Sequence, residues 1–273
     1  MAGSDRPTPA AGAADAAAAA DPAPVRPPLP IERAQDQIFA KGTSSRAKYA
    51  ALVVGQPGLP ALLTYELIVM MAQARPGAFG LLLRKWLYPR LLGSCGRNVV
   101  FGQNVVLRHP HKVHIGSDVV IDDNCLVDAK GETNRGIRIG SGVFIGRNSI
   151  LSCKNGNIDV ADKVNIGFNC ELFSASELQV GRSVLMAAYT YVIGGGHDFS
   201  DPSRPVLEQG RHSRGVTIGE GAWIGAGAKI LDGVSIGAHA VIGAGAVVRE
   251  SVAAGAIAVG VPARVVSMRA PES

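Results

Sequence analysis

A branched apolar residue recurs at every sixth position through the C-terminal part of the chain. Between residues 218 and 248 these anchors are Ile218, Ile224, Ile230, Ile236, Ile242 and Val248. Four positions after five of them comes a small apolar residue: Ala222, Ala228, Val234, Ala240 and Ala246. A period of six is incommensurate with the 3.6-residue turn of an α-helix, and glycine, which breaks helices, recurs through the windows. The pattern therefore excludes an amphipathic helix.

The same period appears earlier in the chain in groups of three anchors. These groups are Ile115, Ile121, Val127; Ile139, Ile145, Leu151; Val160, Ile166, Leu172; and Val180, Met186, Val192, with insertions only between groups. Three hexapeptides close one triangular coil, and stacked coils bury what a single coil cannot. Many glycines (34) with few aromatics (5%) suit such a narrow interior. The sequence predicts an all-β, parallel β-helix.

The chain divides into three regions by composition. Residues 1–30 are rich in Ala and Pro and are expected to be disordered, because they have little apolar surface to bury. Residues 31–92 form an expected helical region, with helices in 59–92 broken at Pro76-Gly77. Residues 93–268 form the expected β-helix, with a loop at 193–217.

Charge and targeting signals limit the compartment and the partners. The net charge is +5, and no Asp or Glu occurs between Leu67 and Ser117. The apolar helices at 59–92 either cap the first coil or dock on anionic lipid through Arg84, Lys85, Trp86, Tyr88 and Arg90. No secretory signal, membrane-spanning run or CxxC spacing is found. We expect reduced thiols and a cytoplasmic protein, at most peripheral to the inner face of the membrane.

Two stretches carry a resemblance to a known family. These are "GGHDFSDPSRPV" and "VTIGEGAWIGAGAKILDGVSIGAHAVIGAGAVVRESVAAGAIAVGVPARVV". Over about residues 93–268 the chain resembles the hexapeptide-repeat acyltransferases, in the sugar and polysaccharide O-acetyltransferase branch similar to maltose and galactoside acetyltransferases. The resemblance implies a left-handed coil, a homotrimer with sites between subunits, and acetyl-CoA as cosubstrate. It implies neither a metal nor a nucleic-acid partner.

His197 lies in the largest interruption of the repeat, the 26 positions between the anchors Val192 and Ile218. It matches the catalytic histidine of the family, which implies that it deprotonates the acceptor hydroxyl for direct attack on acetyl-CoA. An imidazole suits that step because its ordinary pKa of about 6.5 lets it accept a proton near neutrality. Asp198 either orients this imidazole or serves only as a turn residue, in which case a backbone carbonyl takes the orienting role.

The resemblance also assigns binding residues. The implied donor residues are Trp223, Gly225 and Ala226 at the thioester, Ala244 at the pantetheine arm, and Arg249 and Arg264 at the CoA phosphates. The candidate acceptor residues are Asn169, Tyr189 and Tyr191. At the position of the family's substrate-binding Asn this chain has Gly167, so the acceptor does not transfer simply from the family.

Four alternatives remain beside sugar O-acetylation. Two use the same coil for acyl transfer, as an N-acyltransferase on an amino sugar or as a serine acetyltransferase. A third is a zinc carbonic anhydrase-like β-helix, for which His109, His111 and His114 are the candidate ligands, although they are interleaved with basic residues and precede the recognised anchors. The fourth is a non-catalytic scaffold, which would leave the context of His197 unexplained.

Overall fold

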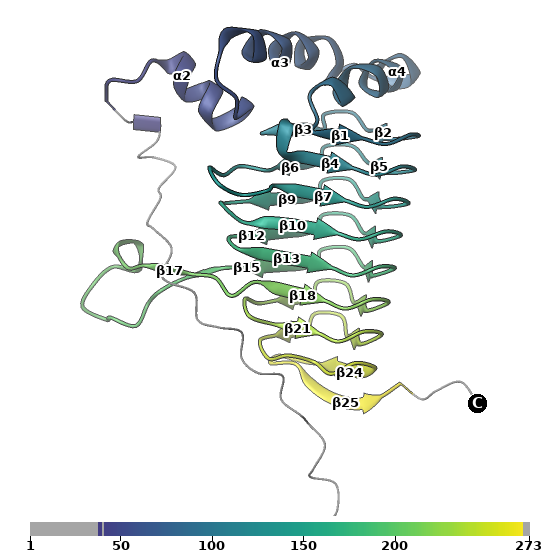
Figure 1. The fold of residues 1–273 in the computed structure, drawn as a ribbon. Helices are drawn as coiled ribbons and strands as arrows, with labels where there is room; N and C mark the ends of the chain where they lie inside the picture. Colours follow the sequence, from purple (N-terminus) through teal and green to yellow (C-terminus); the bar gives the residue numbers. More distant parts are fainter. Residues whose placement is uncertain (1–37, 40, 270–273) are drawn as a thin grey trace, which may run out of the picture.

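The computed structural model describes residues 38, 39 and 41–269, so the predicted tail at 1–30 lies outside the described residues. From Ser94 to Met268 the chain is a stack of triangular coils (Figure 1). Each coil contributes a short strand to each of three sheets, and these sheets form the faces of a prism. The predicted fold class, a left-handed parallel β-helix of hexapeptide repeats, is confirmed.

The three faces take their strands in turn along the chain. The first face contains β1 (Ser94–Cys95), β4 (Val113–Ile115), β7 (Ile137–Ile139), β10 (Asn157–Val160), β13 (Glu177–Val180), β18 (Val216–Ile218) and β21 (Ser235–Ile236). The second contains β2 (Val100–Phe101), β5 (Val120–Ile121), β8 (Phe144–Ile145), β11 (Asn165–Ile166), β14 (Leu185–Met186), β19 (Trp223–Ile224), β22 (Val241–Ile242), β24 (Ala256–Val259) and β25 (Arg264–Met268). The third contains β3 (Val106–Arg108), β6 (Leu126–Asp128), β9 (Ile150–Cys153), β12 (Glu171–Ser174), β15 (Tyr191–Gly194), β20 (Lys229–Ile230) and β23 (Val247–Val248).

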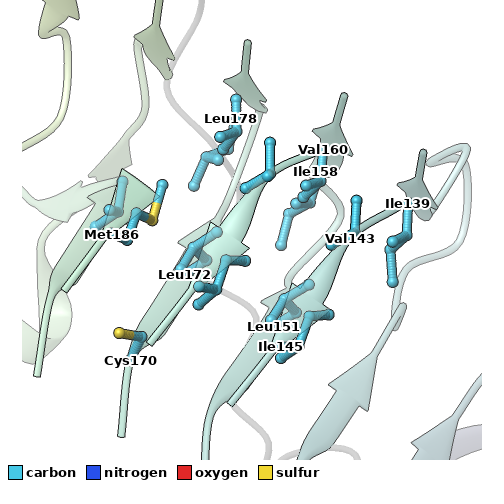
Figure 2. Close-up of a cluster of buried hydrophobic side chains, with 14 of the residues drawn as sticks. Ile139, Val143, Ile145, Leu151, Ile158, Val160, Cys170, Leu172, Leu178 and Met186 are labelled. Carbon is cyan, nitrogen blue, oxygen red and sulfur yellow. The ribbon is translucent and has the colours of Figure 1, made fainter. Parts of the chain in front are cut away.

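The predicted anchors form the interior of the prism. Every anchor from Ile115 to Val248 is at most 4% exposed, and the small residues four positions later are equally buried. Like side chains stack on like in successive coils: Leu151 and Leu172 are register partners, and Figure 2 shows them in neighbouring coils. Six residues therefore form one side of the triangular coil, which consists of a short strand with an inward anchor and the corner that follows it.

One coil precedes those recognised from the sequence. Cys95, Phe101 and Leu107 occupy the anchor positions of strands β1 to β3. Neither Cys nor Phe fits the branched pattern, which explains why the coil was missed. The expectation that His109, His111 and His114 precede the coils is therefore wrong, because they lie where the first coil leads into the second.

Corners of the prism require a backbone conformation that most residues avoid. Asn104, Asn124, Asn148 and Asn169 have φ between 55° and 61°. Asn tolerates this left-handed region better than most other residues with a side chain, for which the left-handed conformation costs about 1–2 kcal/mol. Their side chains also pair between coils, with Nδ2 to Oδ1 distances of 3.2 Å from Asn104 to Asn124 and from Asn148 to Asn169. Asn169 is thus a member of a structural ladder.

The cysteines fill core and near-core positions as free thiols. All four are unpaired with one another, and Cys125, Cys153 and Cys170 are buried. Burial raises the pKa of Cys125 to about 11. Its Sγ donates to the carbonyl of Gly146 at 3.2 Å. A thiol with a raised pKa is a poor nucleophile, so these side chains act as small apolar residues.

Helices lie across the start of the stack and close it (Figure 1). They are α2 (Ser45–Tyr49), α3 (Leu59–Ala72) and α4 (Gly77–Leu87), with a π-helical turn at Ala50–Val54 and a 3₁₀ turn at Tyr88–Arg90. We call the segment 59–92 the cap. On its inner side Tyr65 donates its hydroxyl to the carbonyl of Leu107 at 2.8 Å, and Tyr88 donates to Val105 at 2.9 Å. The cap therefore satisfies backbone groups that an open first coil would expose to solvent.

Arg84 fastens the cap from inside. Its side chain is only 1% exposed. Nε donates to the carbonyl of Phe101 at 2.9 Å, and Nη1 donates to the carbonyls of Ala72 and Arg75 at 3.0 and 2.7 Å. The Ala72 carbonyl lies at the end of α3, where the helix dipole favours a cation, and the Arg75 carbonyl lies in the turn that follows. Gly80 is required beside this junction, because a Cβ there would lie 1.8 Å from the Arg75 oxygen.

This arrangement corrects part of the predicted lipid contact. Arg84 and Tyr88 are buried against the first coil and are not available to lipid. Lys85, Trp86 and Arg90 are exposed. Along α4 and the turn after it, the buried residues Gly80, Arg84 and Tyr88 are thus spaced four positions apart on one side, which the acid-free composition of this segment did not reveal.

Replacing Arg84 should weaken the cap strongly. Arg84→Met keeps the apolar stem but leaves three buried carbonyls without donors, so we expect a loss of about 3–5 kcal/mol in the free energy of unfolding. Urea titration followed by circular dichroism measures this loss. Lys85→Met removes a charge from the exposed neighbouring position and should stay within about 0.5 kcal/mol of the wild type. Equal stability of the two variants would contradict the fastening role of Arg84.

Candidate functional site

The longest interruption of the coil is an ordered arm that projects from one edge (Figure 1). The chain leaves the third face after β15 and forms a two-stranded antiparallel ribbon, β16 (Gly196–His197) with β17 (Arg211–His212). It returns to the first face at β18. We call the edge between the third and first faces the arm edge. His197 is exposed at the start of the arm, in register with Arg211.

Hydrogen bonds within the arm fix its shape. The Gln209 side chain, 5% exposed, donates from Nε2 to the carbonyls of Asp201 and Arg204 at 2.8 and 2.9 Å. Its Oε1 accepts from the Asp201 amide at 3.1 Å. At the base, Ser213 Oγ donates to the carbonyl of Gly194 at 2.9 Å. His197 is therefore carried on a structured element.

Asp198 and Asp201 both act in turns. Asp198 Oδ1 accepts from the amide of Ser200 at 2.9 Å, and this contact is the largest of the causes that lower the Asp198 pKa. Asp201 Oδ1 accepts from the amide and the hydroxyl of Ser203. No hydrogen bond joins Asp198 to His197 among the described contacts. Of the two roles considered for Asp198, the turn role is the one visible in a single chain.

His212 is a second imidazole at the base of the arm. A Cβ added at Gly196 would lie 2.9 Å from its Nε2, so the His212 ring lies over the strand that carries His197. The sequence does not mark His212 as a candidate, because the two histidines are 15 positions apart and only the ribbon pairing brings them together. No repeat or family pattern marks this position.

The predicted donor residues lie on another edge, where second-face strands lead to the third face. We call it the groove edge. Successive coils approach closely there: the Gly245 amide donates to the carbonyl of Ala226 at 2.8 Å, and a Cβ at Gly225 would lie 2.6 Å from the Ala244 nitrogen. Ala226 and Ala244 are exposed. Trp223, 49% exposed, borders this edge on β19. The groove edge thus presents backbone with little side-chain cover.

Arg249 and Arg264 share one carboxylate. Arg249 Nε lies 3.5 Å from Glu250 Oε1, and Arg264 Nη1 lies 3.3 Å from Glu250 Oε2. All three side chains are more than half exposed. Exposed ion pairs of this kind contribute at most about 1 kcal/mol, so a multiply charged anion can displace Glu250. Two guanidinium groups with one acid form a site suited to phosphate.

Of the predicted acceptor residues, Tyr191 lies on β15, Tyr189 just before it, and Asn169 just before β12. Tyr189 occupies a corner position with φ 63° and is 67% exposed, next to the Asn169 ladder on the groove edge. Tyr191 is half-buried on β15, in register between Glu171 and Lys229. Burial, reinforced by the charge of Glu171, raises the Tyr191 pKa.

One chain does not bring all these residues together. Tyr189 precedes β15 and His197 follows it. A four-residue strand spans about 13 Å, so the arm edge and the groove edge are separated by the width of the third face. Within a single chain His197 therefore lies on a different edge from Ala226 and Ala244.

The three histidines considered as zinc ligands do not converge. His114 Nδ1 contacts Ser94 Oγ at 3.0 Å, whereas His109 Nε2 contacts the carbonyl of Ala51 at 2.9 Å. Over the residues that the structure describes, no cluster of three His, Cys, Asp or Glu side chains is arranged to hold a metal. His109 and His111 instead line a cavity of about 960 Å³ between the π-helical turn and the first coils, away from His197.

Comparison with known proteins confirms the repeat. The pattern of the family described as bacterial transferase hexapeptide (six repeats) matches residues 215–250. A probable acetyltransferase of Mycobacterium tuberculosis is 35% identical over 133 residues, which are 49% of this chain and 44% of the relative. The chain thus spans less than half the length of that relative. The resemblance to hexapeptide-repeat acyltransferases is confirmed, and the matched segment has the hexapeptide repeat of that family.

Solved structures of similar proteins include two transferases. A variant of AntD, an N-acyltransferase from Bacillus cereus, in complex with dTDP and coenzyme A, is 26% identical with a TM-score of 0.47, covering 66% of this chain and 85% of that one. A maltose O-acetyltransferase from Clostridium difficile is 20% identical with a TM-score of 0.42, covering 77% and 86%.

Acidification should loosen the π-helical turn at Ala50–Val54. Burial lowers the pKa of His109 and of His111 below the ordinary 6.5, with Lys112 adding to the effect at both and the contacts to Ala51 and Val54 opposing it. Below about pH 6.5 the folded turn thus binds fewer protons than the released segment does. The stability that the neutral histidines give the turn is therefore lost as the pH falls. Hydrogen exchange of residues 50–54, corrected for intrinsic rates, should show less protection at pH 5.0 than at 7.5.

A non-titrating pair serves as the control for that measurement. His109→Gln with His111→Gln keeps an N–H donor at each position but carries no proton equilibrium. We expect the double variant to show the same corrected protection at both pH values. A pH effect of wild-type size in this variant would assign the loosening to other groups.

Proposed function

We propose that the protein is a CoA-dependent acyltransferase that moves an acetyl group from acetyl-CoA to a hydroxyl of a sugar or glycan precursor. The observation that carries the proposal is His197, exposed on an ordered arm at the one long break in a rigid repeat. The confirmed repeat and the acetyltransferase name of the mycobacterial relative support it. Because acetyl-CoA is a cytoplasmic metabolite, this function implies a cytoplasmic location.

The chemistry requires a base, a groove and donors for the oxyanion. His197 accepts the proton of the acceptor hydroxyl while the oxygen attacks the thioester carbonyl. The tetrahedral intermediate collapses, the C–S bond breaks, and the CoA thiolate takes the proton back from the imidazolium. The backbone amide of the exposed Ala226 is suited to stabilise the oxyanion, whereas the Gly225 amide donates to the carbonyl of Ile242 at 2.7 Å. No acyl-enzyme intermediate is needed.

The separation of the two edges supports a site between subunits of a homotrimer. When three coils pack side by side about a threefold axis, the arm edge of one copy faces the groove edge of the next. The arm also exposes apolar side chains, Phe199 at 75%, Val206 at 46% and Leu207 at 59%. Such a cluster on an ordered element is typical of a surface that a partner covers.

On the groove edge, the small residues give the pantetheine arm room to lie against the backbone. Ala226 and Ala244 are exposed on this surface, Gly225 lies buried against the Ala244 backbone, and Trp223 borders it. Arg249 and Arg264 then receive the phosphates in place of Glu250. Asn169, Tyr189 and Tyr191 lie along the face that joins the two edges, where the acceptor would bind. An amine acceptor, as in an N-acyltransferase, would use the same base.

Removal of His197 should abolish transfer while the coil stays folded. We expect His197→Ala to lower kcat by about 10²–10⁴, the usual contribution of a general base. Release of free CoA, followed with a panel of sugars and amino sugars as acceptors, measures it. His212→Ala removes the neighbouring imidazole. Its kcat should remain within about threefold of the wild-type value, a much smaller change than the loss of a general base would cause. The reverse result would move the base to His212.

The shared carboxylate provides a second test. Arg264→Ala should raise the KM for acetyl-CoA about tenfold, the loss of one charge-assisted contact of about 1.4 kcal/mol. Glu250→Gln frees both arginines and should lower that KM. With acetyl-pantetheine, which lacks the nucleotide phosphates, both effects should vanish. An equal KM rise for acetyl-pantetheine would show that Arg264 acts on something other than phosphate.

A further inference from the structure

The cap has a second apolar side that the coil does not use. On α3, the side facing the first coil holds Tyr65, Ile68 and Ala72, at helical spacing i, i+3, i+7. The opposite side holds Leu59, Leu63, Leu67 and Met70, and on α4 the corresponding exposed stripe is Phe79, Leu82 and Trp86. We call these seven residues the outer face.

The outer face is unusually apolar for a solvent-exposed surface. Its seven side chains are between 49% and 71% exposed. A helix that only covers a core carries polar residues on its far side. Here the inner residues already account for the packing on the first coil, so the outer residues have no partner within the described chain. Contiguous exposed apolar surface of this kind marks an interaction site.

Basic residues outnumber acidic ones around the outer face. Arg75, Lys85 and Arg90 are exposed beside it. Glu66 is the single acid between residues 59 and 92, and its carboxylate accepts a hydrogen bond of 2.5 Å from the Tyr49 hydroxyl. A surface of Leu, Met, Phe and Trp bordered by Lys and Arg is complementary to the headgroup–acyl boundary of a bilayer with anionic lipid.

We propose that the outer face docks this protein on an anionic membrane surface. The contact lies on the bilayer and does not cross it. Helix α3 has 14 residues, about 21 Å, against a hydrocarbon thickness of about 30 Å. In the described part of the chain no single helix meets the criteria for a span, and one bent pair, Ser45–Val54 with Leu59–Ala72, meets them by length and composition only. Tyr65 and Ile68 bind α3 to the coil along its inner side.

The position of the outer face relative to the arm gives membrane docking a role in the proposed function, and that role rests on the proposed function. The arm leaves the fifth coil, four steps of about 4.8 Å from the first, and the helices of the cap add about 10 Å, so His197 would act roughly 30 Å from the membrane surface. An acceptor whose sugar portion stands away from a lipid anchor would present its hydroxyl at such a height. In a trimer with parallel axes the three outer faces are coplanar, which multiplies a weak contact.

Co-sedimentation with vesicles tests the proposal. The full chain is mixed with vesicles of phosphatidylcholine alone or with 30% phosphatidylglycerol, a composition chosen to give a clearly anionic surface at roughly the −50 mV of PS-rich membranes. We expect binding to the anionic vesicles that is at least several-fold stronger and that weakens between 0.1 and 0.5 M NaCl, about the range over which screening becomes severe. A chain that stays in the supernatant with both vesicles would overturn the proposal.

Matched variants locate the contact. Leu63→Gln, Phe79→Gln and Trp86→Gln together should lower the partition coefficient at least tenfold, since each removes apolar area that the bilayer would bury. Val265→Gln, Val266→Gln and Met268→Gln remove equally exposed residues from β25 and should leave binding unchanged. Circular dichroism checks that both variants fold. Equal binding of the outer-face variant and the wild type would defeat the proposal.

Two further measurements distinguish membrane docking from self-association and from loss of acyl transfer. If the outer face joins copies of this chain, sedimentation velocity without lipid would show the outer-face variant losing an assembly that the wild type forms, and this result would overturn the membrane assignment. His197→Ala should bind vesicles like the wild type. Loss of acyl transfer and loss of membrane binding are therefore independent outcomes, and either proposal can fail alone.

Discussion

Stacking of coils is the interaction on which the rest of this structure depends. No hexapeptide can bury its inward side chain alone, but a column of anchors such as Leu151 and Leu172 excludes water along its whole length. The parallel ladders on the three faces then pair the backbone groups between coils. Because each coil is held only by its neighbours, regularity is itself the stabilising principle, and every departure from it must be supported separately.

The ends of the stack and the arm are such departures, and each has its own support. At the start, the cap covers the first coil, and Arg84 donates to one carbonyl of that coil and to two carbonyls of the cap. At the far end, β25 folds back antiparallel on β24 and gives the last rung a partner. The arm has no stack to rest on, and the Gln209 side chain replaces it with three hydrogen bonds. Polar networks thus take over where the repeat stops.

The period of six was sufficient to predict the fold, because an interior with one inward residue per strand leaves a direct trace in the sequence. It failed for the first coil, since the anchor positions there hold a partly buried Cys95 and a buried Phe101, neither of which is a branched aliphatic residue. The burial of Arg84 could not be read from composition, because a buried arginine depends on carbonyls brought together by tertiary packing. His212 beside Gly196 follows only from the pairing of two ribbon strands. The position of His197 was predictable, since an interruption is visible wherever the surrounding pattern is strict.

A rigid stack also fixes distances that flexible folds leave open. The number of coils between the cap and the arm sets how far His197 stands from whatever the outer face contacts, and no hinge interrupts the ladders between β1 and β15. Inserting one coil in that interval would displace the arm by about 4.8 Å without altering its own hydrogen bonds. Reach and chemistry are therefore set by different parts of the sequence: the arm residues determine what His197 can do, and the coil count before it determines where it does so.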